Sequence, residues 1–395
     1  MSSDTVQYVL TDTVHADKWM DNWSLTSQQL PGHHPVTPWK LSKRTLQGGK
    51  RHGVDLIELD NGALQLSILP TRGMSIWRGQ YQSIRLGWDA PIHGPVHPQW
   101  VHLEDRGGLG WLDGFDEWIV RCGLAFNGPP GDDLGKFITL HGRIANTPAH
   151  FVGVRVQQTP PYTIEVVGRV QESSLFGDQL HLTTILSTTP GSNRFTIQDM
   201  VENRSSRETE MQMLYHCNFG PPLLGAGSRL KVPAAKITPR DAVAAAQIEN
   251  FESYAGPTTG QSELVNYYQP KADEKGETLA VLHAADLNSA CAVRFNTREL
   301  PWFIAWKNTA SIQDGYVTGL EPATGFPNFK GVERKHHRLV KLAAGAKWIA
   351  SLTFELENNK VGVERLLSDV ARLQGTELPQ VCRQPDPVWS GIEGK

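Results

Sequence analysis

Three short segments of the chain place a residue that can exchange protons beside glycine or proline. They are Leu140-His141-Gly142-Arg143, Tyr215-His216-Cys217-Asn218-Phe219-Gly220 and Leu320-Glu321-Pro322-Ala323-Thr324-Gly325. Each lies at the end of a strand-like run, and loops held at the ends of strands commonly carry functional groups. Histidine has an ordinary pKa of about 6.5, so it both gives and takes protons near neutrality. The segments predict acid–base chemistry; a structural histidine and a glutamate that accepts turn N–H groups are the alternatives.

Other catalytic motifs are missing from the sequence. There is no Gly-x-Ser-x-Gly elbow, no Walker loop and no His-Glu-x-x-His helix. The glycines of Gly107-Gly108-Leu109-Gly110 lack a surrounding βαβ pattern, which argues against a dinucleotide site. No Cys-x-x-Cys pair occurs, so the cysteines are expected to be reduced and mostly packed. Between tryptophans lies an acidic cluster, interpreted as a solvated loop with cation or sugar-hydroxyl binding as the alternative: Asp113, Asp116 and Glu117.

The elements that must position these groups are mainly strands. Apolar and polar residues alternate on both sides of Asp60-Asn61-Gly62, the pattern of a tight hairpin, and a second hairpin is predicted around residues 189–193. Further strand-like runs cover residues 163–170, 280–283, 292–295 and 348–356. Strands that recur with turn signals between them favour antiparallel sheets in a sandwich or barrel.

Helical periodicity is clear only near the end of the chain. Apolar residues from Val363 to Leu373 follow helical spacing, and Gly375 stands where a C-cap glycine is expected. Residues 1–50 are polar and irregular. We therefore predict an N-terminal extension over 1–45, one large β-domain over 46–360, and a C-terminal helix and tail over 361–395.

Composition sets the broad class of the protein. The 395 residues are 39% hydrophobic and 20% charged, which is typical of a globular chain, and the net charge of −3 offers no basic field for nucleic acid. No run approaches the roughly 20 apolar residues of a transmembrane helix, and the first residues lack a secretory signal, so a cytoplasmic location is expected. Tryptophan stacks well on sugar rings. Four tryptophans are expected to line either a pocket or the core: Trp77, Trp88, Trp100 and Trp111.

The three segments occur in order with further short motifs, namely Pro70-Thr71-Arg72-Gly73-Met74-Ser75-Ile76, Arg121-Cys122-Gly123-Leu124 and Gly128-Pro129-Pro130. Together, from about Thr45 to Leu356, they resemble the galactose-mutarotase-like (aldose 1-epimerase) superfamily, and more closely its branch described as a domain of unknown function. The resemblance implies a mostly β fold, the β-supersandwich, whose concave face holds a sugar. It implies that His141 and His216 contact the sugar ring and that Glu321 acts as the base, with no cofactor.

The chain departs from the superfamily pattern upstream of the first histidine. Typical members carry Gly-Arg-x-x-Asn-Arg there, whereas here Arg143 and Asn146 follow His141. Since arginine forks two hydroxyls or a carboxylate, an acidic sugar is an open alternative. The residues expected to bind substrate are His141, Arg72, Arg143, Asn146 and Asn218.

Three functional hypotheses remain. The first is a mutarotase in which Glu321 removes the O1 proton and His216 protonates the ring oxygen O5. The second is an isomerase, lyase or hydrolase on an oxidised or acidic sugar, with a divalent cation held by His141, His216 and Glu321. The third is a carbohydrate-binding protein without turnover. All three expect a small carbohydrate as partner, and none expects nucleic acid or membrane.

Overall fold

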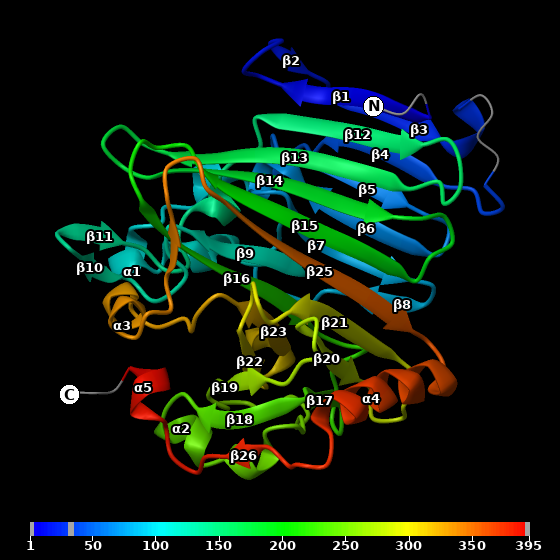
Figure 1. Cartoon of the computed structure of the whole chain (residues 1–395). Helices are drawn as coiled ribbons and strands as arrows, with labels where there is room; N and C mark the ends of the chain where they lie inside the picture. Colours follow the sequence, from blue (N-terminus) through cyan, green and yellow to red (C-terminus); the bar gives the residue numbers. More distant parts are fainter. Residues whose placement is uncertain (1–3, 31–34, 392–395) are drawn as a thin grey trace.

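Two large sheets form the body of the protein in the computed structural model, which describes residues 4–30 and 35–391 (Figure 1). The first sheet has the spatial order β17 (Arg229–Lys231), β20 (Glu277–His283), β21 (Ala290–Asn296), β25 (Lys347–Glu357), β15 (Arg194–Asn203), β14 (Gln179–Thr188), β13 (Ile164–Ser173), β12 (Phe151–Gln157), β1 (Thr5–Asp12) and β2 (Lys18–Trp19). Neighbouring strands pair antiparallel throughout this sheet.

The second sheet carries the three segments with candidate chemistry. Its order is β26 (Gln380–Val381), β18 (Ala234–Pro239), β19 (Leu264–Pro270), β22 (Trp302–Asn308), β23 (Val317–Ala323), β16 (Thr209–Phe219), β9 (Ile119–Leu124), β7 (Ser75–Tyr81), β6 (Leu64–Leu69), β5 (Asp55–Asp60), β4 (Lys40–Thr45) and β3 (Asn22–Thr26). β24 (Val340–Leu342) pairs with β16, and β8 (Ile84–Leu86) pairs with β7. A separate hairpin joins β10 (Gly131–Asp133) and β11 (Lys136–Ile138).

Helices are short apart from one. They are α1 (Asp105–Gly108), α2 (Ala242–Ala245), α3 (Lys330–Lys335), α4 (Lys360–Gln374) and α5 (Pro387–Ser390). The predicted C-terminal helix is α4; Asn359 accepts a hydrogen bond from the Gly362 N–H at its start, and Gly375 ends it at φ 68°. Its apolar side packs on the outer face of β20 and β21. In the described part of the chain, no helix is long and apolar enough to cross a membrane.

Both predicted hairpins are present. β5 and β6 pair around the Asn61 turn, where Asn61 Oδ1 accepts hydrogen bonds from the N–H groups of Ala63 (2.9 Å) and Leu64 (2.7 Å). β14 and β15 form the second hairpin. The four further strand-like runs lie within β13, β20, β21 and β25, apart from the first residue of the run at 163. A mostly β protein of large antiparallel sheets is confirmed.

Residues 4–30 and 35–45 differ from the irregular extension that the sequence predicted. β1 pairs with β12 in the first sheet, and β3 and β4 extend the second sheet from β5. Part of each strand is buried, as Leu10 on β1 and Leu41 on β4 show, both without exposed surface. These strands were not predicted because only one face of each packs on the core, so their overall composition remains polar.

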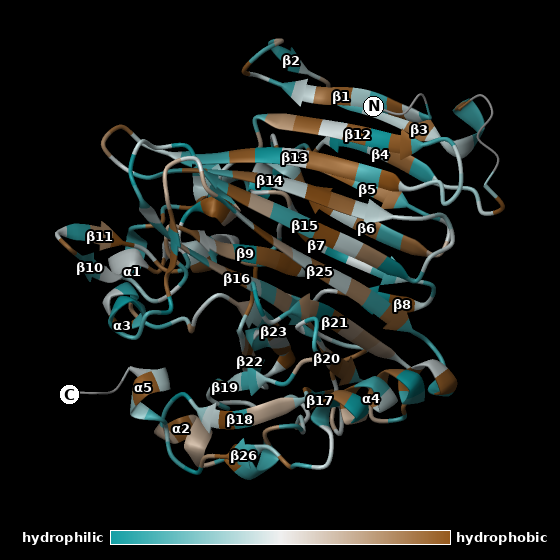
Figure 2. Ribbon diagram, in the orientation of Figure 1, coloured by the Kyte–Doolittle hydropathy of each residue, from teal (hydrophilic) through white to brown (hydrophobic). Residues whose placement is uncertain are grey.

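The main core lies between the two sheets. Phe195 on β15 stacks on Phe354 of β25, with ring centroids 4.8 Å apart, and the ring of Trp118, just before β9, packs edge-on against both. Strands of the first sheet alternate apolar and polar residues, visible as alternating brown and teal bands in Figure 2. In contrast, β16 and β23 are buried on both faces. A second layer of side chains must therefore cover the side of these strands that faces away from the main core.

A buried ion pair connects the sheets. Arg121 of β9 donates to both oxygens of Asp199 on β15, at 2.5 and 2.9 Å. The Tyr215 hydroxyl on β16 donates to Asp199 at 2.9 Å, and Thr184 on β14 donates at 2.7 Å. Because every oxygen of the carboxylate is matched by donors, the charges can stay buried without a large penalty. This network fixes β9 and β16 against the opposite sheet.

Candidate functional site

His216 and Glu321 lie directly opposite each other on neighbouring strands. β16 and β23 pair with Leu214 opposite Ala323 and Cys217 opposite Leu320, and this antiparallel register brings His216 to Glu321. His216 Nε2 lies 3.1 Å from Glu321 Oε1. Both residues are buried, at 6% and 3% exposure. Two groups that the sequence separates by more than a hundred positions therefore form one pair.

Asn218 determines which ring nitrogen of His216 faces the glutamate. The Asn218 amide nitrogen donates to the backbone oxygens of Glu117 (3.0 Å) and His216 (3.2 Å). Its Oδ1 must then face His216, and it lies 2.5 Å from Nδ1. An amide oxygen only accepts, so Nδ1 carries a hydrogen and the unprotonated Nε2 faces Glu321. Asn218 was expected to bind substrate; in the structure its amide groups are occupied by the protein.

His141 approaches from a loop and is oriented in the same manner. Its Nδ1 donates to the backbone oxygen of Asn127 at 2.7 Å, which leaves Nε2 as an acceptor. Asn127 is in turn held by Gln212 of β16, whose side chain donates to Asn127 Oδ1 at 3.1 Å. The rings of His141 and His216 are 5.9 Å apart. Both histidines thus depend on β16 for their orientation.

Aromatic rings enclose the two histidines. Trp111 lies 4.7 Å from His141, while Phe115 and Trp306 lie 5.0 and 5.2 Å from the His216 ring, measured between centroids. The Trp111 indole N–H is buried and has no hydrogen-bond partner within the described residues. An apolar enclosure with one free donor suits a molecule with both apolar faces and hydroxyls.

Burial sets the protonation of the site. It lowers the pKa of His216 to about 3 and that of His141 to about 4, and it raises the pKa of Glu321 well above its usual range. Near pH 7 both imidazoles are therefore uncharged, and the Glu321 carboxyl is shifted toward its protonated form. Glu321 Oε1 has no hydrogen-bond partner in the described residues and lies 3.1 Å from the unprotonated Nε2 of His216. When the carboxyl is protonated, the two groups together hold one proton.

Arg72 and Asn146 are near one another but do not join the histidines. Arg72 is fully buried, forms an ion pair with Glu117 at 2.8 Å and donates to Asn146 Oδ1 and to the backbone oxygen of Gly114 at 2.8 Å. The guanidinium is thus engaged by the protein itself, where it anchors the loop that leads to Phe115. The substrate-binding role expected for Arg72 stays a prediction.

The acidic cluster is not a solvated loop. Glu117 is buried and pairs with Arg72, and Asp116 is buried and accepts the Trp77 indole N–H at 2.8 Å. Of the three acids only Asp113 reaches the surface, where it pairs with Arg106.

The four tryptophans named from the sequence also lie in different environments. Trp111 is at the histidines, Trp88 packs on Phe115, and Trp100 is about half exposed.

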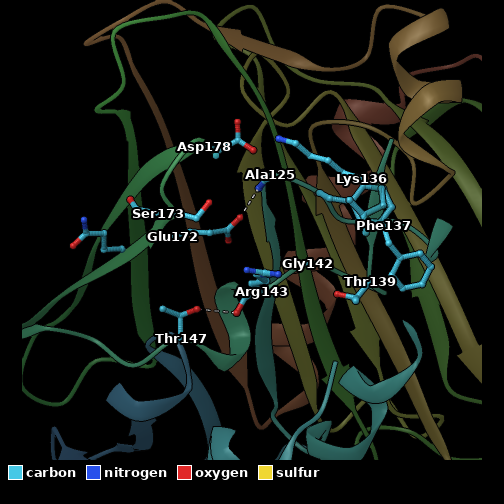
Figure 3. Close-up of a pocket in the computed structure, with 15 residues that line it drawn as sticks. Ala125, Lys136, Phe137, Thr139, Gly142, Arg143, Thr147, Glu172, Ser173 and Asp178 are labelled. Carbon is cyan, nitrogen blue, oxygen red and sulfur yellow. Dashed lines mark hydrogen bonds between the residues drawn. The ribbon is translucent and has the colours of Figure 1, made fainter. Parts of the chain in front are cut away.

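Arg143 lies in a separate cavity, shown in Figure 3. This cavity has a volume of about 320 Å³ and is lined by Thr139, Gly142 and Arg143, but not by His141, His216 or Glu321. The backbone explains the separation: His141 and Gly142 both adopt left-handed conformations, with φ 59° and 73°. The chain therefore reverses between His141 and Arg143, and their side chains diverge.

The geometry does not support the expected alternative of a metal site. Over residues 4–30 and 35–391, no three His, Cys, Asp or Glu side chains are arranged to hold a metal ion. His141, His216 and Glu321 are therefore not such a set in this structure.

Some residues of the site were not predicted from sequence. Phe115, Trp306 and Asn127 contribute through packing or a backbone carbonyl, which carry no sequence motif. Gly319 is another: an added Cβ would lie 2.5 Å from Glu321 Oε1 and 3.0 Å from the His216 ring. The one sequence signal was the spacing: Gly319 precedes Glu321 by two residues, which places both on the same face of a strand.

Comparisons with known proteins agree on the fold. A crystallised Klebsiella pneumoniae protein, which carries the provisional name aldose 1-epimerase, is 35% identical, with a TM-score of 0.94 over 96% of this chain and 99% of that one. A galactose mutarotase-like protein of Clostridium acetobutylicum is 14% identical with a TM-score of 0.55, covering 80% of this chain and 98% of its own. Galactose 1-epimerase of Lactobacillus acidophilus is 12% identical with a TM-score of 0.53, covering 81% and 99%.

The last two similarities concern the fold alone, since their sequence identities are low. No curated protein matches the chain. The family called Domain of unknown function (DUF4432) matches residues 51–356, the same span that holds both histidines and the glutamate. The chain therefore belongs to the DUF4432 family and has the galactose mutarotase-like fold.

Proposed function

We propose that the protein interconverts the anomers of a sugar, as an aldose 1-epimerase does, by acid–base catalysis at His216 and Glu321. The observation that carries the proposal is the 3.1 Å approach of His216 Nε2 to Glu321 Oε1 inside an aromatic enclosure. Anomer interconversion needs one group to take the O1 proton while another protonates O5. A pair that holds one proton contains both groups.

The proposed step moves protons only between the pair and the sugar. With the shared proton on His216, Glu321 takes the O1 proton and His216 gives its proton to O5; the C1–O5 bond breaks and an aldehyde forms at C1. Rotation about C1–C2 presents the other face of the aldehyde. The two transfers then reverse, O5 attacks C1, and the pair regains its starting state. Nothing is oxidised, so no cofactor is consumed.

Burial favours the proton on Glu321, so the pair must first exchange it across 3.1 Å to reach that assignment. Sugar hydroxyls entering the site supply hydrogen bonds to the ionised carboxylate and reduce the cost of its charge. His141 Nε2 is an acceptor for one hydroxyl, and the Trp111 indole N–H is a donor for another. We assign to His141 and Trp111 the role of positioning the sugar through these two contacts.

The charges near the pair favour a neutral sugar over an acidic one. Arg240 acts on Glu321 electrostatically, but it already pairs with Glu263 at 2.9 Å and Asp241 at 2.8 Å. Glu263 also accepts the Trp306 indole N–H at 2.7 Å. A carboxylate or phosphate on the substrate would meet these two acids, whereas hydroxyls would not be repelled.

The experiment is NMR saturation transfer between anomers over neutral aldoses, uronic acids and keto-sugars, with wild type, Glu321→Gln and Glu58→Gln. Glu58 is about half exposed and serves as a matched control. We expect exchange with a neutral aldose that Glu321→Gln lowers at least about 100-fold and Glu58→Gln leaves unchanged. Equal loss in both variants, or exchange that survives Glu321→Gln, contradicts the role of Glu321. Sugar binding without exchange would indicate a carbohydrate-binding protein.

A further inference from the structure

The cavity around Arg143 is built from four separate parts of the chain. The β10–β11 hairpin contributes Lys136 and Phe137, and the segment on either side of His141 contributes Thr139 and Arg143. The end of β13 and the turn after it contribute Glu172 and neighbouring serines, and the segment after β9 closes the cavity. Figure 3 shows Arg143 in the middle of this space and Lys136 extending over it from the hairpin. The cavity is thus a formed space beside the loop that carries His141.

Its two cationic side chains are unmatched. In the described residues, neither the Arg143 guanidinium nor the Lys136 ammonium has an ion pair or a side-chain hydrogen bond. Their positive charges influence the pKa values of Glu172 and Asp133, respectively, from a longer distance only. Asp133 is already bound to Arg334 by two contacts of 2.8 Å. Unpaired cations at the wall of a cavity attract an anion.

The acids beside them do not cancel this charge. Both oxygens of Glu172 accept backbone N–H groups, from Leu124 at 2.9 Å and Ala125 at 3.1 Å, and burial raises the pKa of its carboxyl. Glu172 therefore joins β13 to the end of β9, and its oxygens are engaged by the main chain rather than by Arg143. Asp178 also lines the cavity, where it can accept a hydroxyl.

We propose that this cavity binds a hydroxylated small anion, with its phosphate or carboxylate between Arg143 and Lys136. Arginine forks two oxygens of such a group, and lysine adds a single charge. The hydroxyls of Thr139 and Ser174 donate to the same group, Asp178 accepts from a ligand hydroxyl, and Phe137, whose side chain is partly exposed, covers an apolar face. The site is distinct from the histidine pair and does not depend on the reaction proposed there.

Two isoleucines allow binding to be localised by methyl NMR on the full chain. Ile138 lines the cavity, and Ile304 stands opposite Glu321 on β22. We would titrate glucose 6-phosphate, gluconate, inorganic phosphate and glucose separately. We expect glucose 6-phosphate and gluconate to shift the Ile138 methyl saturably; glucose leaves it in place, and inorganic phosphate binds at least about tenfold more weakly than glucose 6-phosphate.

The variants are Arg143→Gln, Lys136→Gln and, as control, Arg372→Gln on the exposed side of α4, where the Arg372 side chain is 62% exposed. Because Arg143 has no side-chain partner, its replacement leaves the fold intact, which circular dichroism checks. We expect Arg143→Gln to weaken binding about tenfold or more, Lys136→Gln less, and Arg372→Gln not at all. The proposal fails if the anions shift only Ile304, if Arg143→Gln and Arg372→Gln behave alike, or if inorganic phosphate binds as tightly as glucose 6-phosphate. The relative strength of glucose 6-phosphate and gluconate identifies the anionic group.

Discussion

Asn218 Oδ1 lies 2.5 Å from Nδ1 of His216, and this contact directs the other ring nitrogen toward Glu321. The amide cannot turn over without losing the bonds that its nitrogen donates to the backbone oxygens of Glu117 and His216. The tautomer of a buried histidine is thus fixed by a neighbour two residues along the same strand. The unprotonated ring nitrogen is thereby kept on the side that faces the glutamate.

Replacing Asn218 tests this directly. Asn218→Leu keeps the approximate volume but removes the acceptor, so the Nδ1 hydrogen loses its partner and the tautomer is no longer selected. We expect anomer exchange to fall about 100-fold, with a smaller change in sugar affinity. The measurement is saturation transfer at several sugar concentrations. Asn218→Asp supplies a stronger acceptor and should retain more activity than Asn218→Leu; the reverse order would contradict the assignment.

The pH profile of exchange follows from the protonation of the pair. The active pair holds one proton. It gains a second proton below the lowered pKa of His216, about 3, and loses its only proton above the raised pKa of Glu321. We therefore expect a plateau over about pH 5 to 8, without an acidic limb near the ordinary histidine pKa. Rates measured across this range decide the matter. A limb centred near pH 6.5 would show that an exposed histidine controls the reaction.

Glu321→Gln should stabilise the protein near neutrality. Because the pKa of Glu321 is raised in the folded state, its contribution favours folding below the ordinary glutamate pKa and is lost as pH rises toward the folded value. Glutamine remains neutral at every pH and avoids this loss. We expect a gain of about 1–3 kcal/mol in the free energy of unfolding at pH 7, shrinking toward pH 4. Urea titrations at both pH values measure it; lower stability at pH 7 would mean that the carboxyl is ionised in the folded state.

The Arg121–Asp199 pair predicts a strong double-mutant coupling. Arg121→Met leaves the Asp199 charge buried and unpaired, so the free energy of unfolding should fall by about 3–5 kcal/mol. Arg121→Met combined with Asp199→Leu removes both charges and should recover part of the loss. Denaturant unfolding of the two single variants and the double variant gives the coupling. Additive losses would show that the ion pair does not connect the sheets energetically.

The sequence predicted the hairpins and the C-terminal helix because their signals are local. Asn61 and Gly375 act on residues within a few positions of themselves. It also brought forward His141, His216 and Glu321, which the structure gathers at one place. Their catalytic roles stay predictions, as do the domain boundaries, although strands replace the irregular segment expected before residue 46.

Arg72 and Arg143 show where sequence reasoning stopped. The partner of Arg72 is Glu117, 45 positions away, and no residue pattern near either of them indicates that the pair is buried. Arg143 stands two residues after His141, yet two successive left-handed residues turn it toward another cavity. Long-range pairing and a local reversal of the chain are both invisible in the composition of a motif.

The loop that carries His141 is tied down by its main chain. The Gly123 N–H bonds to the His141 oxygen, the His141 N–H to the Gly128 oxygen, and the Arg143 N–H to the Gly123 oxygen. Gly142 is confined as well, since a Cβ there would lie 2.4 Å from two backbone oxygens. None of these bonds depends on the side chains that face the Arg143 cavity. The side chains of Arg143 and Lys136 take no part in these bonds, so replacing them can change what the cavity binds without moving the histidine.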